Sequence, residues 1–164
     1  MADANLERIL REHSALARRL AASHEANPEA VRDLTQEILV AVWRAWPAFR
    51  GHCSERTYVA RIAHNRIVTH IARAVRHPPL AGLSEELPAP GLTPEEAAIR
   101  SSDQLRLVAL VRTLPLAYRE VAVLMLEGFT PAEVADTLGL TPNAVAIRGT
   151  RAREMLRALM EARP

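Results

Sequence analysis

Arginine is the side chain in this sequence whose type and placement could do chemistry. All 21 basic residues are arginine, against 19 acidic residues, and the arginines gather in two stretches. Residues 50–77 carry six arginines and one acid, and residues 137–160 carry four arginines and one acid. Arginine stays charged at physiological pH and binds phosphates and base edges in a planar fork. The two stretches therefore indicate a polyanionic partner, with a solvated helix face as the simpler alternative.

Side chains for catalysis or metal binding are not arranged in familiar patterns. The sequence has no glycine-rich phosphate loop, no paired carboxylates and no Ser-His-Asp arrangement, so we expect no catalytic residues, no cofactor and no enzyme. Potential metal ligands are present at His52, Cys53, His64, His70 and His77. No pair of them has the i, i+4 spacing of a helical site, and one cysteine is too few for a zinc site, so we expect no metal. The single cysteine also excludes a disulfide framework and fits a reducing cytoplasm.

Composition and periodicity predict an all-α protein. Alanine, leucine, arginine and glutamate dominate while aromatic residues make up only 4%, which favours helices over a β-sandwich or barrel. Apolar spacing and capping signals predict helices over 6–22, 28–46, 55–76, 94–113, 117–126, 131–138 and 142–160. No apolar run approaches ~18 residues and the first residues lack a signal-peptide pattern. We therefore expect a cytoplasmic protein without membrane insertion.

A proline- and glycine-rich stretch divides the chain. Residues 78–93 hold four prolines and two glycines, which predicts a linker. The sequence thus predicts two small helical domains, 1–77 and 94–164, joined by this linker. Thr93 and Glu96 predict a capping box at the start of the second domain.

The last forty residues predict a helix-turn-helix at the end of the second domain. This layout needs a small residue in the first helix, a residue tolerating positive φ in the turn, and apolar residues that lock the crossing. Ala135, Gly139 and Val145 meet these needs together with Val134 and Leu138. An ordinary αα-hairpin is the alternative.

The second helix of this pair has an outer face that could meet DNA. Arginine reads guanine bidentately and asparagine can read adenine, so its N-terminal half is the expected base reader. The residues expected there are Asn143, Ala144, Ile147, Arg148 and Arg151. Arg153 and Arg157 lie on the flank and suit phosphates. For any single arginine, a solvated surface charge is an equal alternative.

Several stretches resemble a known family in order along the chain. Residues 33–38 (DLTQEI), 43–51 (WRAWPAFRG) and 56–65 (RTYVARIAHN) resemble the second conserved region of bacterial RNA polymerase sigma factors. Residues 114–115 (LP), 119–121 (REV) and 128–135 (GFTPAEVA) resemble the fourth region. With these two regions and a short linker, the chain resembles an extracytoplasmic-function (ECF) sigma factor.

The resemblance implies a division of labour. The first domain would bind the clamp of the polymerase core and open the promoter element nearest the start site, while the linker threads toward the active-site channel. The second domain would bind the flap region and read the distal element as duplex. An anti-sigma factor would be a further partner, and the free protein would be a monomer. The polymerase-binding residues implied are Asp33, Gln36, Glu37 and Arg44. The DNA-binding residues implied in the first domain are Arg50, His52, Ser54, Arg56, Tyr58, Arg61, Asn65 and Arg66.

The sequence departs from the family pattern at some positions, and other functions are compatible with it. Glu55 stands where the family usually has an apolar residue, and Gly149 stands where the recognition helix often has leucine, which affects the promoter sequence read. We expect Trp43 and Trp46 to pack in the core, with a clamp-facing edge as the alternative for one of them. A stand-alone dimeric helix-turn-helix regulator is the main alternative function. A helical adaptor would instead lack salt-dependent DNA affinity.

Overall fold

The computed structural model describes residues 2–78 and 94–162, and within them it is helical without any strand. The predicted all-α class is confirmed. The predicted linker lies outside the described residues except for Pro78, and so does Thr93 of the predicted capping box. None of the helices that the structure describes combines the length and apolar character needed to cross a membrane.

The N-terminal unit contains three helices and a single 3-10 turn. They are α1 (Ala2–Ala22), α2 (Pro28–Ala45), η1 (Trp46–Ala48) and α3 (Glu55–Arg76). The Asn27 side chain accepts hydrogen bonds from the backbone N–H groups of Glu29 and Ala30, and Ser54 accepts one from Thr57, so Asn27 caps α2 and Ser54 caps α3. The core of the unit is formed by apolar side chains of all three helices, among them Ile9, Leu16, Leu34, Ile38, Val42 and Val59.

The buried face of α3 differs from the one that its apolar spacing predicts. That spacing predicts an inner stripe beginning with Tyr58 and Ile62, whereas the buried residues are Thr57, Val59, Ala60, Ala63 and Ile67. Small side chains at 60 and 63 allow α3 to lie close against α1 and α2, with both of which it packs. Apolar periodicity favours the larger side chains, so the predicted inner face is displaced by about one residue from the face that is buried.

The C-terminal unit is built from four helices, α4 (Pro94–Thr113), α5 (Leu116–Leu126), α6 (Pro131–Leu138) and α7 (Pro142–Glu161). Thr130 and Glu133 form a reciprocal capping box at the start of α6. Gly139 ends α6 with φ of +65°, the left-handed conformation that the sequence predicted for this turn. Val145, Gly149 and Ala152 form the buried face of α7.

Gly149 permits a close approach between α7 and α5. A Cβ added at this position would lie 3.0 Å from the Sδ atom of Met125. The glycine in the middle of α7 therefore lowers the helix propensity but allows α5 and α7 to cross closely.

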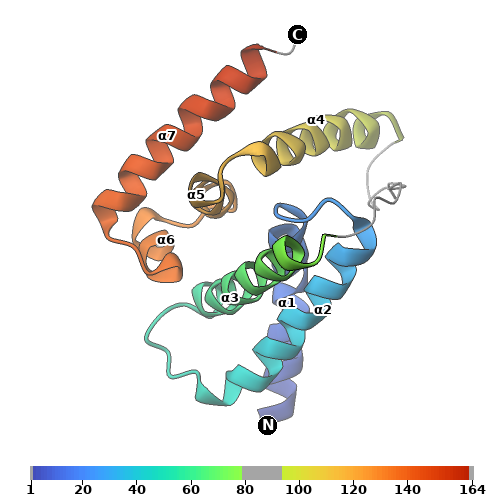
Figure 1. Ribbon diagram of the computed structural model, residues 1–164. Coiled ribbons are helices and arrows are strands. Elements are labelled where there is room, and N and C mark those ends of the chain that lie inside the picture. Colours follow the sequence, from blue (N-terminus) through green and yellow to red (C-terminus); the bar gives the residue numbers. More distant parts are fainter. Residues whose placement is uncertain (1, 79–93, 163–164) are drawn as a thin grey trace.

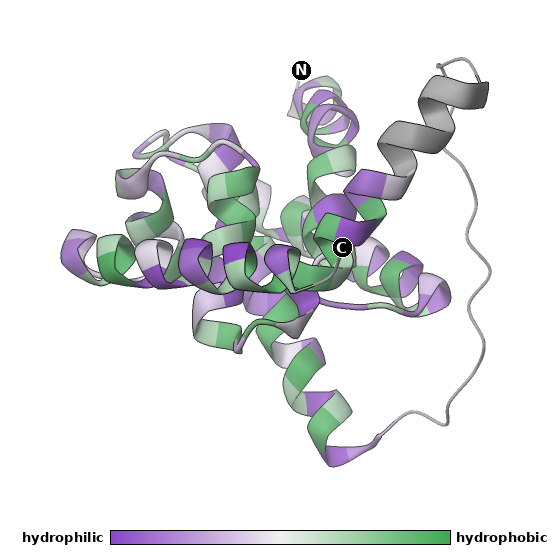
Figure 2. Ribbon diagram, turned by 90° about the horizontal axis from the view of Figure 1, so that it is seen from above, coloured by the Kyte–Doolittle hydropathy of each residue, from purple (hydrophilic) through white to green (hydrophobic). Residues whose placement is uncertain are grey.

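The two units pack against each other, which the sequence did not predict. Figure 1 shows α6 next to α3, and these two helices contact each other directly. One cluster of buried apolar residues includes members of both units, for example Leu20 and Ile67 together with Val123 and Leu124. Apolar and polar positions alternate along the helices in Figure 2, as amphipathic packing requires. The two predicted domains thus share a contact surface in this structure.

Candidate nucleic-acid interface

The helix-turn-helix of α6 and α7 leaves the N-terminal half of α7 accessible. Asn143, Ile147 and Arg151 are exposed, and the Ile147 side chain is 60% exposed, unusually high for a large apolar residue. Ala144 and Arg148 are half-buried. The five residues predicted to read base edges therefore lie together on one helix, although not all are equally open.

The charge of Arg148 acts on an acidic group of α5. Burial raises the pKa of Glu120, while the charges of His64, Arg148 and Arg119 act in the opposite direction. His64 Nδ1 lies 3.5 Å from Glu120 Oε1. Arg148 thus belongs partly to a polar cluster between α3, α5 and α7, which the sequence did not predict.

Two further arginines of α7, Arg151 and Arg153, have partners within their own helix. Arg151 Nη1 lies 3.5 Å from Glu154 Oε2, and both side chains are well exposed. Arg153 Nε donates a hydrogen bond of 3.3 Å to the Gly149 carbonyl. Ion pairs of this exposed kind contribute little stability, so a phosphate or base could replace them at small cost.

On α3, two of the predicted DNA-binding arginines contact the C-terminal unit. Arg61 Nη2 donates a hydrogen bond of 2.6 Å to Asp136 Oδ2 on α6. Arg56 donates to the Glu127 carbonyl, and its guanidinium lies 4.2 Å from the centroid of the Phe129 ring. Sequence reasoning missed Asp136 and Glu127, because nothing local marks partners more than seventy residues away.

Three other predicted residues have local structural contacts. Tyr58 Oη donates to the Ala45 carbonyl at 2.9 Å, and its ring centroid lies 4.9 Å from that of Phe49. Ser54 caps α3, and Arg50 Nη1 donates to the Pro47 carbonyl at 2.8 Å. These contacts fix the loop that precedes α3.

The remaining predicted residues of this surface lie along the loop and α3. His52 and Asn65 are exposed, and Arg66 is half-buried. Asn65 lies one helical turn after Arg61, so the two share a face of α3. The structure therefore brings a loop, an aromatic cluster and an arginine-bearing helix into one region.

One face of α2 is exposed and carries both polar and apolar side chains. Asp33, Gln36, Glu37 and Arg44, the four residues predicted to bind polymerase, are all exposed. Val40 and Trp43 lie among them and are 44% and 55% exposed. The expectation that Trp43 packs in the core was wrong, whereas Trp46 is half-buried and stacks on Phe49 with ring centroids 4.7 Å apart. Ile38 and Val42 lie on the buried side of α2, whereas Trp43 lies on its exposed side.

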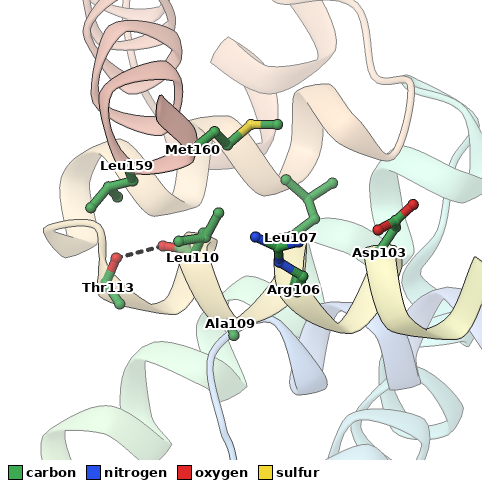
Figure 3. A pocket seen from close by; sticks show the side chains of 8 residues that line it. All are labelled: Asp103, Arg106, Leu107, Ala109, Leu110, Thr113, Leu159 and Met160. Atoms are coloured by element: carbon green, nitrogen blue, oxygen red, sulfur yellow. Dashed lines mark hydrogen bonds between the residues drawn. The ribbon is translucent and has the colours of Figure 1, made fainter. Parts of the chain in front are cut away.

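Two apolar hollows border α4. One, of about 690 Å³, lies between α4 and the end of α7, where Leu107 and Leu110 face Leu159 and Met160 (Figure 3). The other, of about 430 Å³, lies between the end of α1, α4 and α5. It includes the exposed apolar side chains of Leu105 and Leu126.

One group of potential metal ligands, unnoticed in the sequence, is brought together by α1 and α3. Ligand atoms of Glu12, His13 and Glu55 lie within 4.8 Å of one another. Arg8 donates to both carboxylates, at 2.7 Å to Glu12 and 2.9 Å to Glu55, and its hydrogen bond lowers the pKa of Glu55. A cation would have to displace this guanidinium, so the cluster functions as an ion-pair network between the two helices.

Comparison with known proteins gives matches to both units. The family described as Sigma-70 region 2 matches residues 9–77, and the family described as Sigma-70, region 4 matches residues 104–156. Among solved structures, CnrH in complex with the cytosolic domain of CnrY is similar with a TM-score of 0.71 and 25% identity, covering 97% of this chain and 89% of that one. The sigma factor RpoE of Bartonella quintana, in complex with the anti-sigma factor NepR, has the same fold, with a TM-score of 0.76 at 18% identity over 98% of this chain and 99% of that one.

Curated relatives carry the same description. The ECF RNA polymerase sigma factor ShbA of Streptomyces griseus is 38% identical over 138 residues, covering 80% of this chain and 72% of ShbA. The ECF RNA polymerase sigma factor SigG of Mycobacterium tuberculosis is 32% identical over 151 residues, which cover 77% of this chain but 41% of SigG. The two units occur in the order region 2, then region 4, and both match over most of their length. This chain belongs to the extracytoplasmic-function family of RNA polymerase sigma factors.

Proposed function

We propose that the two units divide promoter recognition as the sequence predicted. Residues 1–77 bind the polymerase core and open the proximal promoter element, residues 94–164 read the distal element as duplex, and residues 78–93 connect them. As a sigma factor, the protein directs the polymerase to promoters and helps to open DNA. We propose that it acts in the bacterial cytoplasm, as a monomer when free, and without catalysing a reaction itself.

The exposed face of α2 is the proposed site for the polymerase clamp. This proposal is supported by exposed charged and apolar side chains on the same face. Val40 and Trp43 provide apolar area that a partner could cover. Asp33, Gln36, Glu37 and Arg44 surround this area with groups that fix the orientation of a partner. We assign the binding of core polymerase to this face.

The loop before α3 and α3 itself form the proposed proximal reader. Single-stranded bases need a basic surface with aromatic platforms. Arg50, Arg56 and Arg61 supply positive charge close to the cluster of Phe49 and Tyr58. His52, Ser54, Asn65 and Arg66 border this surface and complete the proposed set.

The N-terminal half of α7 is the proposed distal reader. The observation that supports the function best is the helix-turn-helix itself, with its positive-φ glycine and an exposed base-facing end. Asn143, Ala144, Ile147, Arg148 and Arg151 are the proposed base contacts. Arg153, which bends back along α7, is the proposed phosphate contact.

An anti-sigma factor is the proposed regulatory partner. Among the similar solved structures, CnrH is in complex with the cytosolic domain of CnrY, and the sigma factor RpoE is in complex with the anti-sigma factor NepR. The hollows along α4 expose Leu105, Leu126 and Met160, which give a partner helix apolar surface to cover. Binding there would lower the hydrogen exchange of α4 in the complex.

Run-off transcription with purified core polymerase, with and without the protein, tests the proposed function. A promoter-dependent transcript that needs the protein supports it. Mass and promoter symmetry separate it from the alternative, because a regulator of the helix-turn-helix class would be a dimer on a palindrome. A dimer that binds palindromic DNA and gives no transcript with core polymerase would contradict the proposal.

A further inference from the structure

A cluster of charged and imidazole side chains joins α1 to the first turn of α3, and none of its members has a role in the proposed function. Glu12 and His13 belong to α1, and Glu55 is the first residue of α3. One ligand atom from each of these three residues lies within 4.8 Å of those of the other two. Glu55 is also a position at which the chain departs from the family pattern, so the shared function of the family does not explain the cluster.

His13 is the member of the cluster that an ion-pair network leaves unexplained. Its Nε2 atom is buried and has no hydrogen-bond partner among the described residues. Burial lowers the pKa of His13, against the charges of Glu55 and Glu12, which act in the opposite direction. The imidazole is therefore neutral near pH 7, and the neutral form is the one that binds a metal ion.

The donor atoms of the cluster suit a divalent transition metal. Zinc sites with an open position commonly have three protein ligands drawn from imidazole and carboxylate groups, with water as the fourth ligand. An imidazole among the ligands favours zinc, nickel or copper over magnesium and calcium. Ligand atoms that share one tetrahedral zinc ion lie about 3.4 Å apart, so small side-chain rotations would bring these three into place.

Arg8 holds the two carboxylates in the chain alone, and this contact can be replaced. Its guanidinium donates to Glu12 at 2.7 Å and to Glu55 at 2.9 Å. The three side chains are 41%, 51% and 37% exposed, and ion pairs at such exposure contribute little stability. Arg8 also donates to the Asn5 side chain at 2.8 Å, so it has another partner within its own helix. A divalent ion held by three ligands would therefore displace the guanidinium at small cost.

We propose that Glu12, His13 and Glu55 form a binding site for a divalent transition-metal ion, which displaces Arg8 from the two carboxylates and links α1 to α3. The site lies outside the histidines and the cysteine that the sequence marked as potential ligands. It goes beyond the proposed function and does not depend on it. An ion that binds only the folded chain stabilises the fold by mass action.

Titration of the metal-free full chain with zinc chloride tests the proposal. Isothermal titration calorimetry gives the affinity and stoichiometry for the wild type, His13→Gln and Glu12→Gln, with His77→Gln at an exposed position as the matched control. We expect His13→Gln and Glu12→Gln to bind Zn²⁺ at least ~10-fold more weakly, and His77→Gln to bind as the wild type does. No measurable binding by the wild type, or wild-type affinity in His13→Gln, would overturn the proposal.

Removal of Arg8 gives a result that a purely structural role of the cluster would not. Arg8→Ala deletes ion pairs between the two helices, yet it should tighten Zn²⁺ binding by about 3- to 10-fold, because it removes the competing cation. Arg11→Ala removes an exposed arginine from the same helix and controls for the change in net charge. Binding by Arg8→Ala that is no tighter than binding by Arg11→Ala would overturn the proposal.

Thermal unfolding separates a site in the folded chain from binding to the unfolded chain. Zn²⁺ should raise the unfolding midpoint of the wild type and of His77→Gln, whereas Mg²⁺ at the same concentration should leave it unchanged. His13→Gln should unfold at the same temperature with and without Zn²⁺. An equal Zn²⁺-dependent shift in the wild type and His13→Gln would overturn the proposal.

Discussion

The two proposed DNA-reading helices differ in what surrounds their arginines. On α7, Arg151 and Arg153 have partners in their own helix, Glu154 and the Gly149 carbonyl. On α3, Arg56 and Arg61 have partners in the other unit of the chain. Arg151 and Arg153 can exchange their partners by rotating a side chain, whereas Arg56 and Arg61 can do so only if the two units separate. We infer that the distal reader is available in the free protein and that the proximal reader becomes available on opening.

The largest expected effect comes from shortening the linker, because the two units then cannot separate far enough to reach both promoter elements. Sixteen residues reach about 50–58 Å when extended, and a family-typical spacer of ~17 base pairs measures ~58 Å. Deletion of residues 84–90 leaves at most about 32 Å, so we expect run-off transcription to be lost while thermal unfolding of the helices is unchanged. The compact form does not need such a span, so the radius of gyration measured by small-angle scattering should be unchanged. Full transcription from the shortened protein would show that the two units need not separate this far.

A double substitution on α2 tests whether this helix of the N-terminal unit binds the polymerase. Gln36→Ala with Glu37→Ala removes two exposed polar side chains from α2, so the fold should be unaffected. Loss of hydrogen bonds to a partner typically costs enough to weaken core binding about tenfold or more. Glu7→Ala, which removes an exposed charge from α1, is the control. Unchanged co-purification of the double variant with core polymerase would remove α2 from the interface.

The contact between the units also contains a half-buried histidine, His24, that predicts a pH dependence. Burial lowers the pKa of His24 to about 3, with the charges of Arg119 and His64 acting in the same direction. Its Nδ1 atom has no hydrogen-bond partner among the described residues. The residue lines a small space between the two units that is also lined by Glu120.

The sign of the effect follows from the two states of His24. In the unfolded chain the group has its ordinary pKa of 6.5 and takes up a proton below that pH, whereas the folded chain does so only near pH 3. The free energy of unfolding therefore falls as the pH drops from 7, by about 2 kcal/mol at pH 5. Denaturant unfolding at pH 7 and pH 5 measures this, and His24→Leu should flatten the difference. His52→Gln, at an exposed position, should keep the wild-type difference. A His24→Leu protein with an undiminished pH effect would contradict this assignment.

The smallest expected effects concern two glycines of the helix-turn-helix. Gly139→Ala places a side chain at φ of +65° and should lower the free energy of unfolding by about 1–2 kcal/mol. Gly149→Ala gains about 1 kcal/mol of helix propensity but brings a Cβ within 3.0 Å of the flexible Met125 side chain, so its net effect should be near zero. Thermal unfolding of both variants measures the difference. A Gly139→Ala protein as stable as the wild type would show that the turn tolerates other residues.

The helices and their caps could be predicted from the sequence because their signals are local. Asn27 before Pro28, Ser54 before α3 and Gly139 after α6 each satisfy backbone groups within a few residues. The inner face of α3 could not be predicted, because Ala60 and Ala63 are buried through close packing with other helices. The exposure of Trp43 likewise depends on how the helices of its unit assemble.

Members of the candidate site could be proposed from the sequence, but their partners in the structure could not. Arginine density marked the stretch that holds Arg56 and Arg61, the family resemblance assigned these two to DNA binding, and helix periodicity marked Arg151. The acids that bind two of them, Glu127 and Asp136, come from a distant segment with its own capping and packing roles. Contacts between the two units depend on tertiary packing that no local pattern encodes.

The central claim is that α3 and α7 read different promoter elements, and one selection experiment tests it most directly. A promoter library with both elements randomised is transcribed by core polymerase with the wild type, Arg61→Ala, Arg148→Ala, Arg151→Ala and Arg157→Ala, and the transcribed promoters are sequenced. We expect Arg148→Ala or Arg151→Ala to change the distal sequences selected, because a lost bidentate base contact costs about 1–3 kcal/mol at particular base pairs. Arg61→Ala should affect use of the proximal element only, and Arg157→Ala should weaken all promoters about equally. If neither Arg148→Ala nor Arg151→Ala alters the distal sequence, or if Arg61→Ala does, the division of labour between the two helices is wrong.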